Sequence, residues 1–477
     1  MRVRGNMTVF AALLFMLVAS LLFALLEAAR VNMLGAYADM TSELALESVF
    51  AEYQPGLWED YHLLCLDGAY GGTVFSEEYV TSTLGARIRK NLDTQGDGSR
   101  IMEVAYGSAI PENYHVLTDG DGRVFLHCIA DYMKENLPLI TVRSLYERYA
   151  GQQAIEEGDS VDESIRNAKQ ALDEVQIQKK SRIQNENLLD TVLTCKQSFL
   201  LGMVVEDVER LSTQRIVQAG CLQNRILQSG TSVQIPEVEW YDRILVMEYA
   251  DNYFSDYSTH QNERALAYEM EYVVCGKASD RENLDGVVKR LLLAREAANV
   301  IHITLNQEKR LAVSEAAVAL AGATANPAVI KAVEYGLIGA WAYAESILDI
   351  RALLYGEKIA LIKNEKQWTS SLANLQQILE GSLRASDCEG GWSYQDYLKG
   401  FLVVMPEKNL AYRMMDIMEQ NICRIYAYRN CRMDHMLIAA DYIITYEAAP
   451  LFWKFSTLAC NDVGKLQYQT MQSFSYY

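Results

Sequence analysis

The sequence predicts a mainly α-helical protein with a smaller α/β part, anchored by one N-terminal transmembrane helix that continues outward as a stem. Three observations support this fold class. The run Gly5–Leu26 has 22 residues without an ionisable side chain, enough to span a bilayer as a helix. Only 7 prolines occur among 477 residues, and long segments rich in Ala, Leu and Glu favour helix. Strand-like segments are confined to the region after the stem and to the C-terminal end.

The apolar run is followed by Glu27 and Arg30, which we expect to mark the outer boundary of the membrane anchor. Arg2 and Arg4 precede the run, and positive residues tend to stay on the cytoplasmic side. We therefore expect a cytoplasmic N-terminus and an extracytoplasmic bulk. A cleaved signal peptide is the competing interpretation, but its apolar region has about 7 to 15 residues. The run is longer, so we expect it to be retained.

The segment Glu27–Tyr53 contains no proline, so the helix is expected to continue to Tyr53, where Gln54-Pro55-Gly56 breaks it. The helix Met7–Tyr53 would be about 70 Å long at about 1.5 Å per residue. A helix that is half membrane span and half shaft is the shape of a pilin-like subunit.

Composition excludes some functions and bounds others. The net charge of −19 and pI near 4.9 argue against nucleic-acid binding, which requires a basic surface. A hydrophobic content of 50% is enough for a sizeable core. The 9 cysteines are odd in number and several have apolar neighbours, so we expect buried thiols, although an extracytoplasmic location also permits a disulfide.

The chain divides into three predicted regions: residues 1–56 as tip, span and stem, residues 57–228 as a mixed α/β region, and residues 237–477 as a helix-rich region. Arg100–Tyr106 is a strand candidate in the mixed region. Gln152–Asn187 has apolar residues at helical spacing and is expected to form an arm, as a local helical hairpin rather than a coiled coil.

The third region begins after a linker that ends at Pro236. Ser279 begins a capping box and a helix, and Asn326-Pro327 begins another, in which Tyr335–Ala344 is apolar or small all round. Ten such residues are too few to span a bilayer, so a buried central helix is expected. Tyr442–Trp453 and Gln467–Tyr477 have the composition of closing strands.

No catalytic, cofactor or metal site can be identified in the sequence. The motifs of zinc hydrolases, serine hydrolases, P-loops and dinucleotide-binding folds are missing from it. The residues Asp119–Gly122 form a turn signal that lacks the later ligands of a calcium loop. Cys423, Cys431 and His435 come nearest to a metal cluster, but no fourth ligand accompanies them.

A buried charge network is predicted between two core helices. Arg295 and Glu296 lie on one helix, and Glu345 and Asp349 lie one turn apart on the other, followed by Arg351. Two carboxylates on one face are able to share a proton and act as acid and base. The interpretation we favour is an interhelical ion-pair network, because buried charges must be paired.

Two resemblances add to this interpretation. The block TVFAALLFMLVASLLFALLEAARV, closed by Glu27 and Arg30, resembles the N-terminal segment of TadE/TadG-like proteins of tight-adherence pilus systems. Phe10 stands where pilin precursors carry a glutamate, counting from Gly5, so the resemblance is to the uncleaved TadG-like members. The segments Tyr53–Gly68, Tyr268–Val300 and Ala340–Trp368 resemble a bacterial family of membrane-anchored proteins of unknown function.

Together these features predict a non-enzymatic structural or assembly component of a tight-adherence pilus or pseudopilus-like surface apparatus. Its expected partners are membrane lipid and proteins of a pilus or secretion apparatus. A membrane-anchored binding module that uses its 29 tyrosines for contacts is the first alternative. A hydrolase that uses Glu345 and Asp349 is the remote one.

Overall fold

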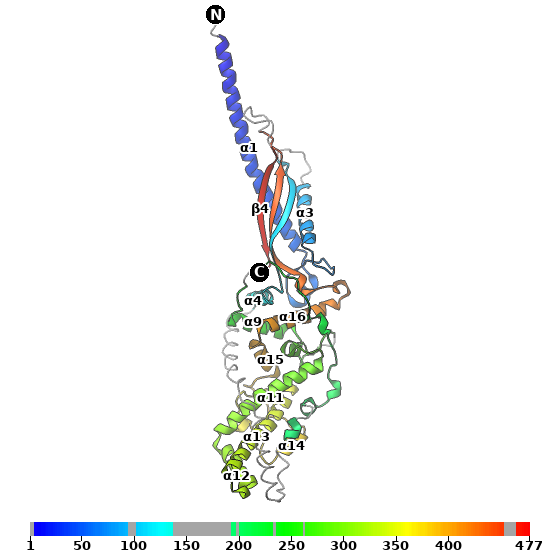
Figure 1. Ribbon diagram of the computed structural model, residues 1–477, viewed down its shortest axis with the longest axis vertical. Coiled ribbons are helices and arrows are strands. Elements are labelled where there is room, and N and C mark those ends of the chain that lie inside the picture. The colour runs from blue at the N-terminus through cyan, green and yellow to red at the C-terminus, as the bar shows by residue number, and fades with distance from the viewer. Residues whose placement is uncertain are drawn as a thin grey trace. The chain divides into compact units, whose positions relative to one another are not determined.

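The computed structural model describes residues 4–93, 102–136, 192–196, 200–231, 235–260, 263–452 and 464–477. The predicted arm Gln152–Asn187 lies outside the described residues. The fold is mainly α with a small antiparallel sheet and a long apolar N-terminal helix, which confirms the predicted fold class (Figure 1).

Residue contacts divide the chain into two compact units. Unit 1 comprises Met1–Cys128, Ile226–Pro236 and Ile422–Tyr477, and unit 2 comprises Ile129–Arg225 and Glu237–Asn421. This partition differs from three consecutive regions, because the C-terminal strands belong to the same unit as the N-terminal helix.

Unit 1 is built around helix α1 (Arg4–Phe50), which is continuous over 47 residues. The helix ends shortly before the expected Tyr53. Helix α2 (Pro55–Tyr61) follows, with Pro55 at its first position and the Gln54 side chain accepting a hydrogen bond from the Gly56 amide. The other elements of this unit are β1 (Leu66–Asp67), α3 (Glu77–Asp93), β2 (Ala105–Val116), β3 (Met436–Ala448) and β4 (Leu466–Ser475), and α4 (Arg123–Asn136) crosses into unit 2.

Strand β3 is the centre of the sheet. It pairs antiparallel with β2 along one side and with β1 and β4 along the other. Two strand boundaries predicted from sequence were wrong. Among the described residues the strand expected over Arg100–Tyr106 begins at Ala105 and continues to Val116, and the strand expected from Tyr442 begins at Met436 and ends at Ala448, ahead of Pro450. A proline has no amide hydrogen to donate to a neighbouring strand.

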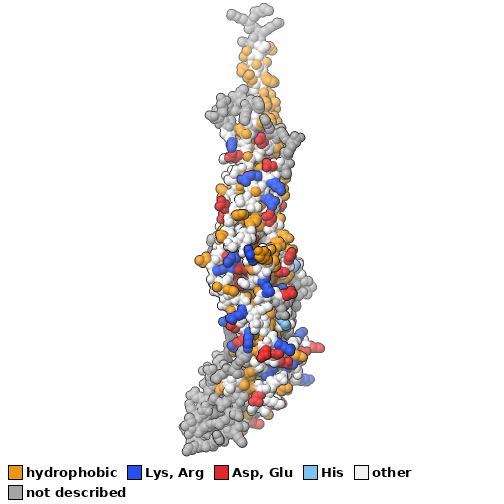
Figure 2. Space-filling model, turned by 90° about the vertical axis from the view of Figure 1, so that its right-hand side faces the viewer, with side chains coloured by type: hydrophobic (Ala, Val, Ile, Leu, Met, Phe, Trp, Pro, Cys, Tyr) orange, Lys and Arg blue, Asp and Glu red, His pale blue; other side chains and the backbone are white. Residues whose placement is uncertain are grey.

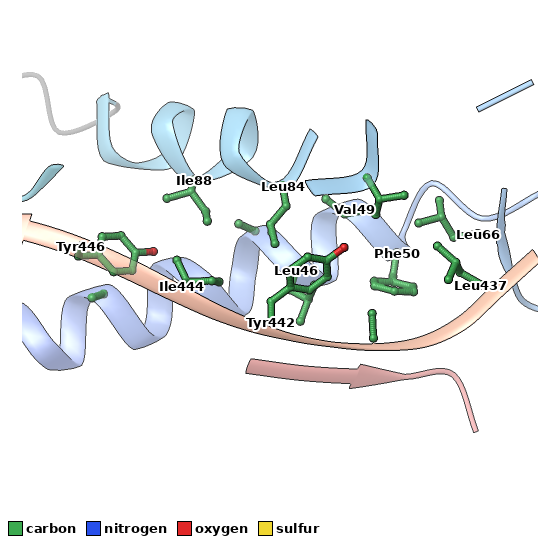
Figure 3. Close-up of a cluster of buried hydrophobic side chains, with 14 of the residues drawn as sticks. Leu46, Val49, Phe50, Leu66, Leu84, Ile88, Leu437, Tyr442, Ile444 and Tyr446 are labelled. Carbon is green, nitrogen blue, oxygen red and sulfur yellow. The ribbon is translucent and has the colours of Figure 1, made fainter. Parts of the chain in front are cut away.

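The core of unit 1 lies on one face of this sheet. Successive residues of a strand point to opposite faces, and Tyr442, Ile444 and Tyr446 of β3 are all buried. Helices α1 and α3 cover that face of β3 (Figure 3). Helix α1 packs against β4, and α3 packs against β2. The Tyr446 hydroxyl lies 2.7 Å from Ser42 Oγ, so even this ring's polar end is hydrogen bonded to α1.

Unit 2 is helical in its described residues. Its long helices α11 (Asp280–Leu305) and α13 (Pro327–Tyr355) pack against each other, and α12 (Gln307–Ala321) packs against α13. Ser279 Oγ accepts a hydrogen bond from the Glu282 amide at 3.3 Å, which confirms the predicted start of α11. The shorter helices are α8 (Leu201–Val204), α9 (Trp240–Tyr253), α10 (Glu269–Cys275), α14 (Leu375–Glu380), α15 (Tyr394–Val403) and α16 (Glu407–Cys423).

The predicted central helix is also confirmed. Asn326 caps α13 by accepting a hydrogen bond from the Ala328 amide at 3.0 Å, with Pro327 in the first turn. Every residue from 336 to 353 is buried. The helix ends at Gly356, whose φ of 100° is a left-handed conformation that glycine adopts without steric cost.

Candidate functional site

The N-terminal half of α1 is almost entirely exposed, because few described residues pack against it. Among the described residues, one helix is long and apolar enough to cross a membrane, Met7–Phe50; the mean hydropathy of its most apolar window is 2.9 and 6% of that window is buried. Large side chains such as Phe15 and Leu21 are exposed along it. Figure 2 shows hydrophobic side chains around this uncovered end of the helix. Exposure of these apolar side chains to water costs free energy, whereas the hydrocarbon of a bilayer would solvate them.

Glu27 and Arg30 lie where the apolar run ends, and both are buried. Arg30 Nη1 lies 2.8 Å from Glu27 Oε1, in an ion pair between residues about one helical turn apart. The pair also binds the chain that follows β3: Arg30 donates to the Ala449 carbonyl at 3.0 Å, and Glu27 accepts from the amides of Leu451 and Phe452 at 3.2 and 2.5 Å. The boundary pair therefore fastens the end of the sheet to α1.

An exposed apolar stripe begins at Leu26, the last residue of the apolar run, and continues past Glu27 and Arg30 along the outer face of α1. Leu26, Met33, Met40 and Leu44 are all about half exposed or more, with relative exposures of 48%, 52%, 59% and 52%. Their spacings, with exposed alanines between them, place them on one side of the helix. The buried side of the same helix faces α3 and the sheet. Within the described residues the stripe is an unpaired apolar surface that extends from the apolar run.

Three of the five residues predicted to form a charge network come together in unit 2. Arg295 Nε donates to Asp349 Oδ2 at 2.9 Å, and Asp349 Oδ1 lies 2.5 Å from Lys363 Nζ. Lys363 also forms an ion pair with Glu345. All four side chains are almost fully buried, at 4% exposure or less. The structure thus joins Arg295, Glu345 and Asp349 through a lysine that sequence reasoning did not identify.

The remaining hydrogen-bonding positions of this cluster are largely filled. Glu345 accepts from the backbone amides of Thr369 and Ser370 at 3.1 and 2.8 Å. Arg295 donates to the Tyr397 hydroxyl at 2.9 Å and to two backbone carbonyls. Burial disfavours the charge of Arg295, but contact with Tyr397 and with the carboxylate of helix α13 raises its pKa overall. The arginine is therefore charged at every physiological pH.

The other two predicted residues point elsewhere. Glu296 pairs with Lys196 at 2.7 Å. Arg351 donates to the carbonyls of Met203, Ile378 and Leu383 at 2.7 to 3.2 Å and so ties α13 to α8, to α14 and to the segment after α14. Burial lowers the pKa of Arg351. Lys363 was missed because it lies in an irregular segment, where neither helical periodicity nor a motif marks it. The carbonyl partners of Arg351 were missed because a backbone acceptor leaves no signal in the sequence.

Unit 2 also contains a cavity of about 590 Å³ whose wall has both polar and apolar side chains. Tyr355, Arg384 and Glu206 form part of its wall. The Arg384 guanidinium lies 3.3 Å from the centre of the Tyr355 ring and donates to Glu206 at 2.7 Å. An aromatic ring beside a fixed cation and a carboxylate is able to hold a small polar ligand or a peptide side chain.

No metal centre is formed by the described part of the chain, in which no three His, Cys, Asp or Glu side chains are grouped to hold an ion. Of the three residues nearest to a cluster in sequence, Cys423 Sγ donates to the Cys431 carbonyl at 3.2 Å. Cys65 and Cys221, two of the described cysteines, are buried free thiols.

Fold and geometry together define a mainly α-helical protein with a small antiparallel sheet and one long N-terminal helix apolar enough to cross a membrane. A model of a family of unknown function, DUF5702, matches residues 178–448, and the chain belongs to this family. No curated protein and no solved structure matches the chain. The matched residues include the charge network of unit 2 and strand β3, and they leave out α1.

Proposed function

We propose that this protein is a membrane-anchored, non-enzymatic assembly component of a pilus or pseudopilus-like surface apparatus. The observation that carries the proposal is α1: a single helix whose first half is bare and apolar and whose second half packs on an antiparallel sheet. This arrangement is that of a pilin-like subunit. The resemblance of the N-terminal block to TadE/TadG-like proteins supports the same assignment.

The exposed stripe on the second half of α1 supports an assembly role over simple anchoring. An anchor requires only length and apolarity within the bilayer. Met33, Met40 and Leu44 lie beyond Arg30, where the helix has left the apolar run, yet they stay exposed. Complete burial of a fully exposed side chain of this size contributes roughly 1.5 to 3 kcal/mol, and each of these half-exposed side chains would gain about half of that. Because the stripe extends the membrane span, the helix that covers it would itself be anchored in the same membrane.

The proposed orientation follows from charge. Arg2 and Arg4 flank the cytoplasmic end of the span, and the chain beyond Glu27 is acidic, so the N-terminus lies in the cytoplasm and the two units lie outside. Protease added to intact cells is expected to cleave beyond Tyr53. Full protection of the C-terminal strands would contradict this orientation.

Photocrosslinking in the native membrane tests the assembly role. A photoreactive amino acid at Leu44 is expected to form defined adducts with other anchored subunits. The same residue at Val74, which is 74% exposed in unit 1 away from the stripe, serves as the control. Met40→Glu in the Leu44-labelled protein is expected to remove those adducts while the protein stays in the membrane. Identical adducts from both labelled positions, or their persistence with Met40→Glu, would refute the proposed docking face.

A membrane-anchored binding module is the second candidate, and the cavity beside Tyr355 and Arg384 favours it. Neighbouring genes for a secretion ATPase and a polytopic platform protein would favour assembly over binding. The hydrolase alternative draws little support from the geometry, because Glu345 and Asp349 are both engaged by Lys363.

A further inference from the structure

The chain immediately after β3 lies at the level of the membrane boundary. Its Ala449 carbonyl and its Leu451 and Phe452 amides are bound by Arg30 and Glu27, as described above. Beyond this point Phe452 extends further along α1: its ring stacks on Phe23, with centroids 6.5 Å apart and an interplanar angle of 13°. Phe23 belongs to the apolar run itself, one helical turn inside its end.

A covered stripe on α1 runs in the same direction. Ser20, Glu27 and Arg30 are buried, and Phe23 between them is partly buried. Their spacing of three or four residues places them on one side of the helix. On the other sides at this level, Leu22 and Leu26 stay exposed. The apolar half of α1 is therefore exposed except along one line, and the described contacts on that line come from Ala449, Leu451 and Phe452.

We propose that Leu451 and Phe452, at the start of the β3–β4 connection, form a second membrane contact that enters the interfacial layer of the lipid bilayer beside α1. This inference rests on the anchoring of α1 in the proposed function. If Phe23 lies within the bilayer, a ring stacked on it at the same level lies there too. The partner of this contact is lipid, because the side chains around Phe23 and Phe452 belong to the exposed apolar face of α1.

The hydrogen bonds of Glu27 and Arg30 match this location. Irregular backbone is tolerated at membrane depth only where its polar groups are satisfied by protein. Two amides of the connection are satisfied by the Glu27 carboxylate and one carbonyl by Arg30. The carboxylate is in turn neutralised by the guanidinium 2.8 Å away, which reduces the cost of a charge near hydrocarbon. The Glu27–Arg30 pair thus neutralises its own charges on α1 and satisfies the backbone of the β3–β4 connection.

Quenching by brominated lipids tests the proposal on the full-length protein in phospholipid vesicles. Phe452→Trp adds a reporter to the six native tryptophans, and the added emission is read against the wild type. We expect lipids brominated near the headgroup to quench this added emission. Ile110→Trp, on the open face of the sheet, is expected to show no quenching. Leu451→Trp repeats the measurement one residue away and replaces the first variant if that variant fails to fold.

Phe15→Trp, in the exposed apolar half of α1, tests the anchoring of α1 separately from the second contact. Quenching at position 15 without quenching at positions 451 and 452 would overturn the second contact and leave the anchor intact. The absence of quenching at position 15 would overturn the anchor itself. The double substitution Glu27→Gln and Arg30→Gln is added to each tryptophan variant in turn. In the Phe452→Trp protein we expect it to reduce quenching at position 452. In the Phe15→Trp protein we expect quenching at position 15 to stay unchanged. Unchanged quenching at 452 with the double substitution would refute the role of the pair.

Discussion

Glu271 of α10 gives the sharpest stability prediction. Its side chain is fully buried; Oε1 accepts the Tyr394 hydroxyl at 2.6 Å and the Tyr257 amide at 2.8 Å, and among the described residues Oε2 has no hydrogen-bond donor. Burial and the nearby Asp256 carboxylate raise the pKa of Glu271 to about 8, against the opposing effect of the two hydrogen bonds. The folded protein therefore holds this side chain protonated at neutral pH.

The magnitude follows from linkage between proton binding and folding. Between its ordinary pKa of 4.5 and about 8, the folded state keeps a proton that the unfolded state has released. Stability accordingly falls as pH rises through this window, by about 1.4 kcal/mol per pH unit. From pH 4.5 to 7 the loss attributable to Glu271 is about 3 kcal/mol, and it ends once the folded group also ionises near pH 8.

Glu271→Gln removes this titration while keeping an acceptor for Tyr394 and Tyr257. We expect the variant to be similar to or slightly less stable than wild type near pH 5 and clearly more stable near pH 8. Thermal unfolding of the full-length protein in detergent, measured at several pH values for both proteins, gives the difference, which for a unit of this size is several degrees in Tm. If the two Tm curves run parallel from pH 5 to 8, Glu271 does not have a raised pKa and the reasoning fails.

Two further substitutions test the cores of the units. Lys363→Met leaves both carboxylates of the charge network without their shared cation and is expected to lower the free energy of unfolding by about 3 to 5 kcal/mol. Lys331→Met, at an exposed ion pair, should change it by less than about 1 kcal/mol. Equal effects of the two substitutions would contradict the network. Ile444→Ala, on the buried face of β3, is expected to lower the free energy of unfolding by about 2 to 5 kcal/mol, and Ile443→Ala, on the opposite face and only partly buried, by clearly less. Denaturant unfolding measures both pairs, and a reversal of the isoleucine order would mean that the sheet faces the other way.

The elements that sequence predicted well are those set by local signals. The apolar run defines the bare half of α1, the Ser279 cap begins α11, and the all-round apolar segment of α13 is buried. Strand boundaries were less accurate because a strand ends where its partner ends. Strand β3 pairs with β2 from Ala105↔Glu447 to Val116↔Leu437, over a separation of more than three hundred residues that no local pattern encodes.

The charge clusters show the same limit. Helical spacing placed Glu345 and Asp349 on one face, and the ion pair of Asp349 with Arg295 follows from the packing of α11 on α13. Lys363 reaches them from an irregular segment, so its role depends on tertiary structure alone. At the membrane boundary the sequence identified Glu27 and Arg30, but the backbone groups they bind lie more than four hundred residues later.

The discontinuity of unit 1 has a consequence for how the chain acquires its structure during synthesis. Helix α1 is made first, but the strands β3 and β4 that cover it are made last, because the sequence of unit 2 lies between them. Domains generally fold as units while the chain emerges, so unit 2 is complete before unit 1 can close. Until β3 and β4 have been synthesised, Ala38, Leu46 and Phe50 of α1 lack the paired strands on which they pack. A nascent chain halted at Asn421 would thus carry a finished unit 2 on an open stem.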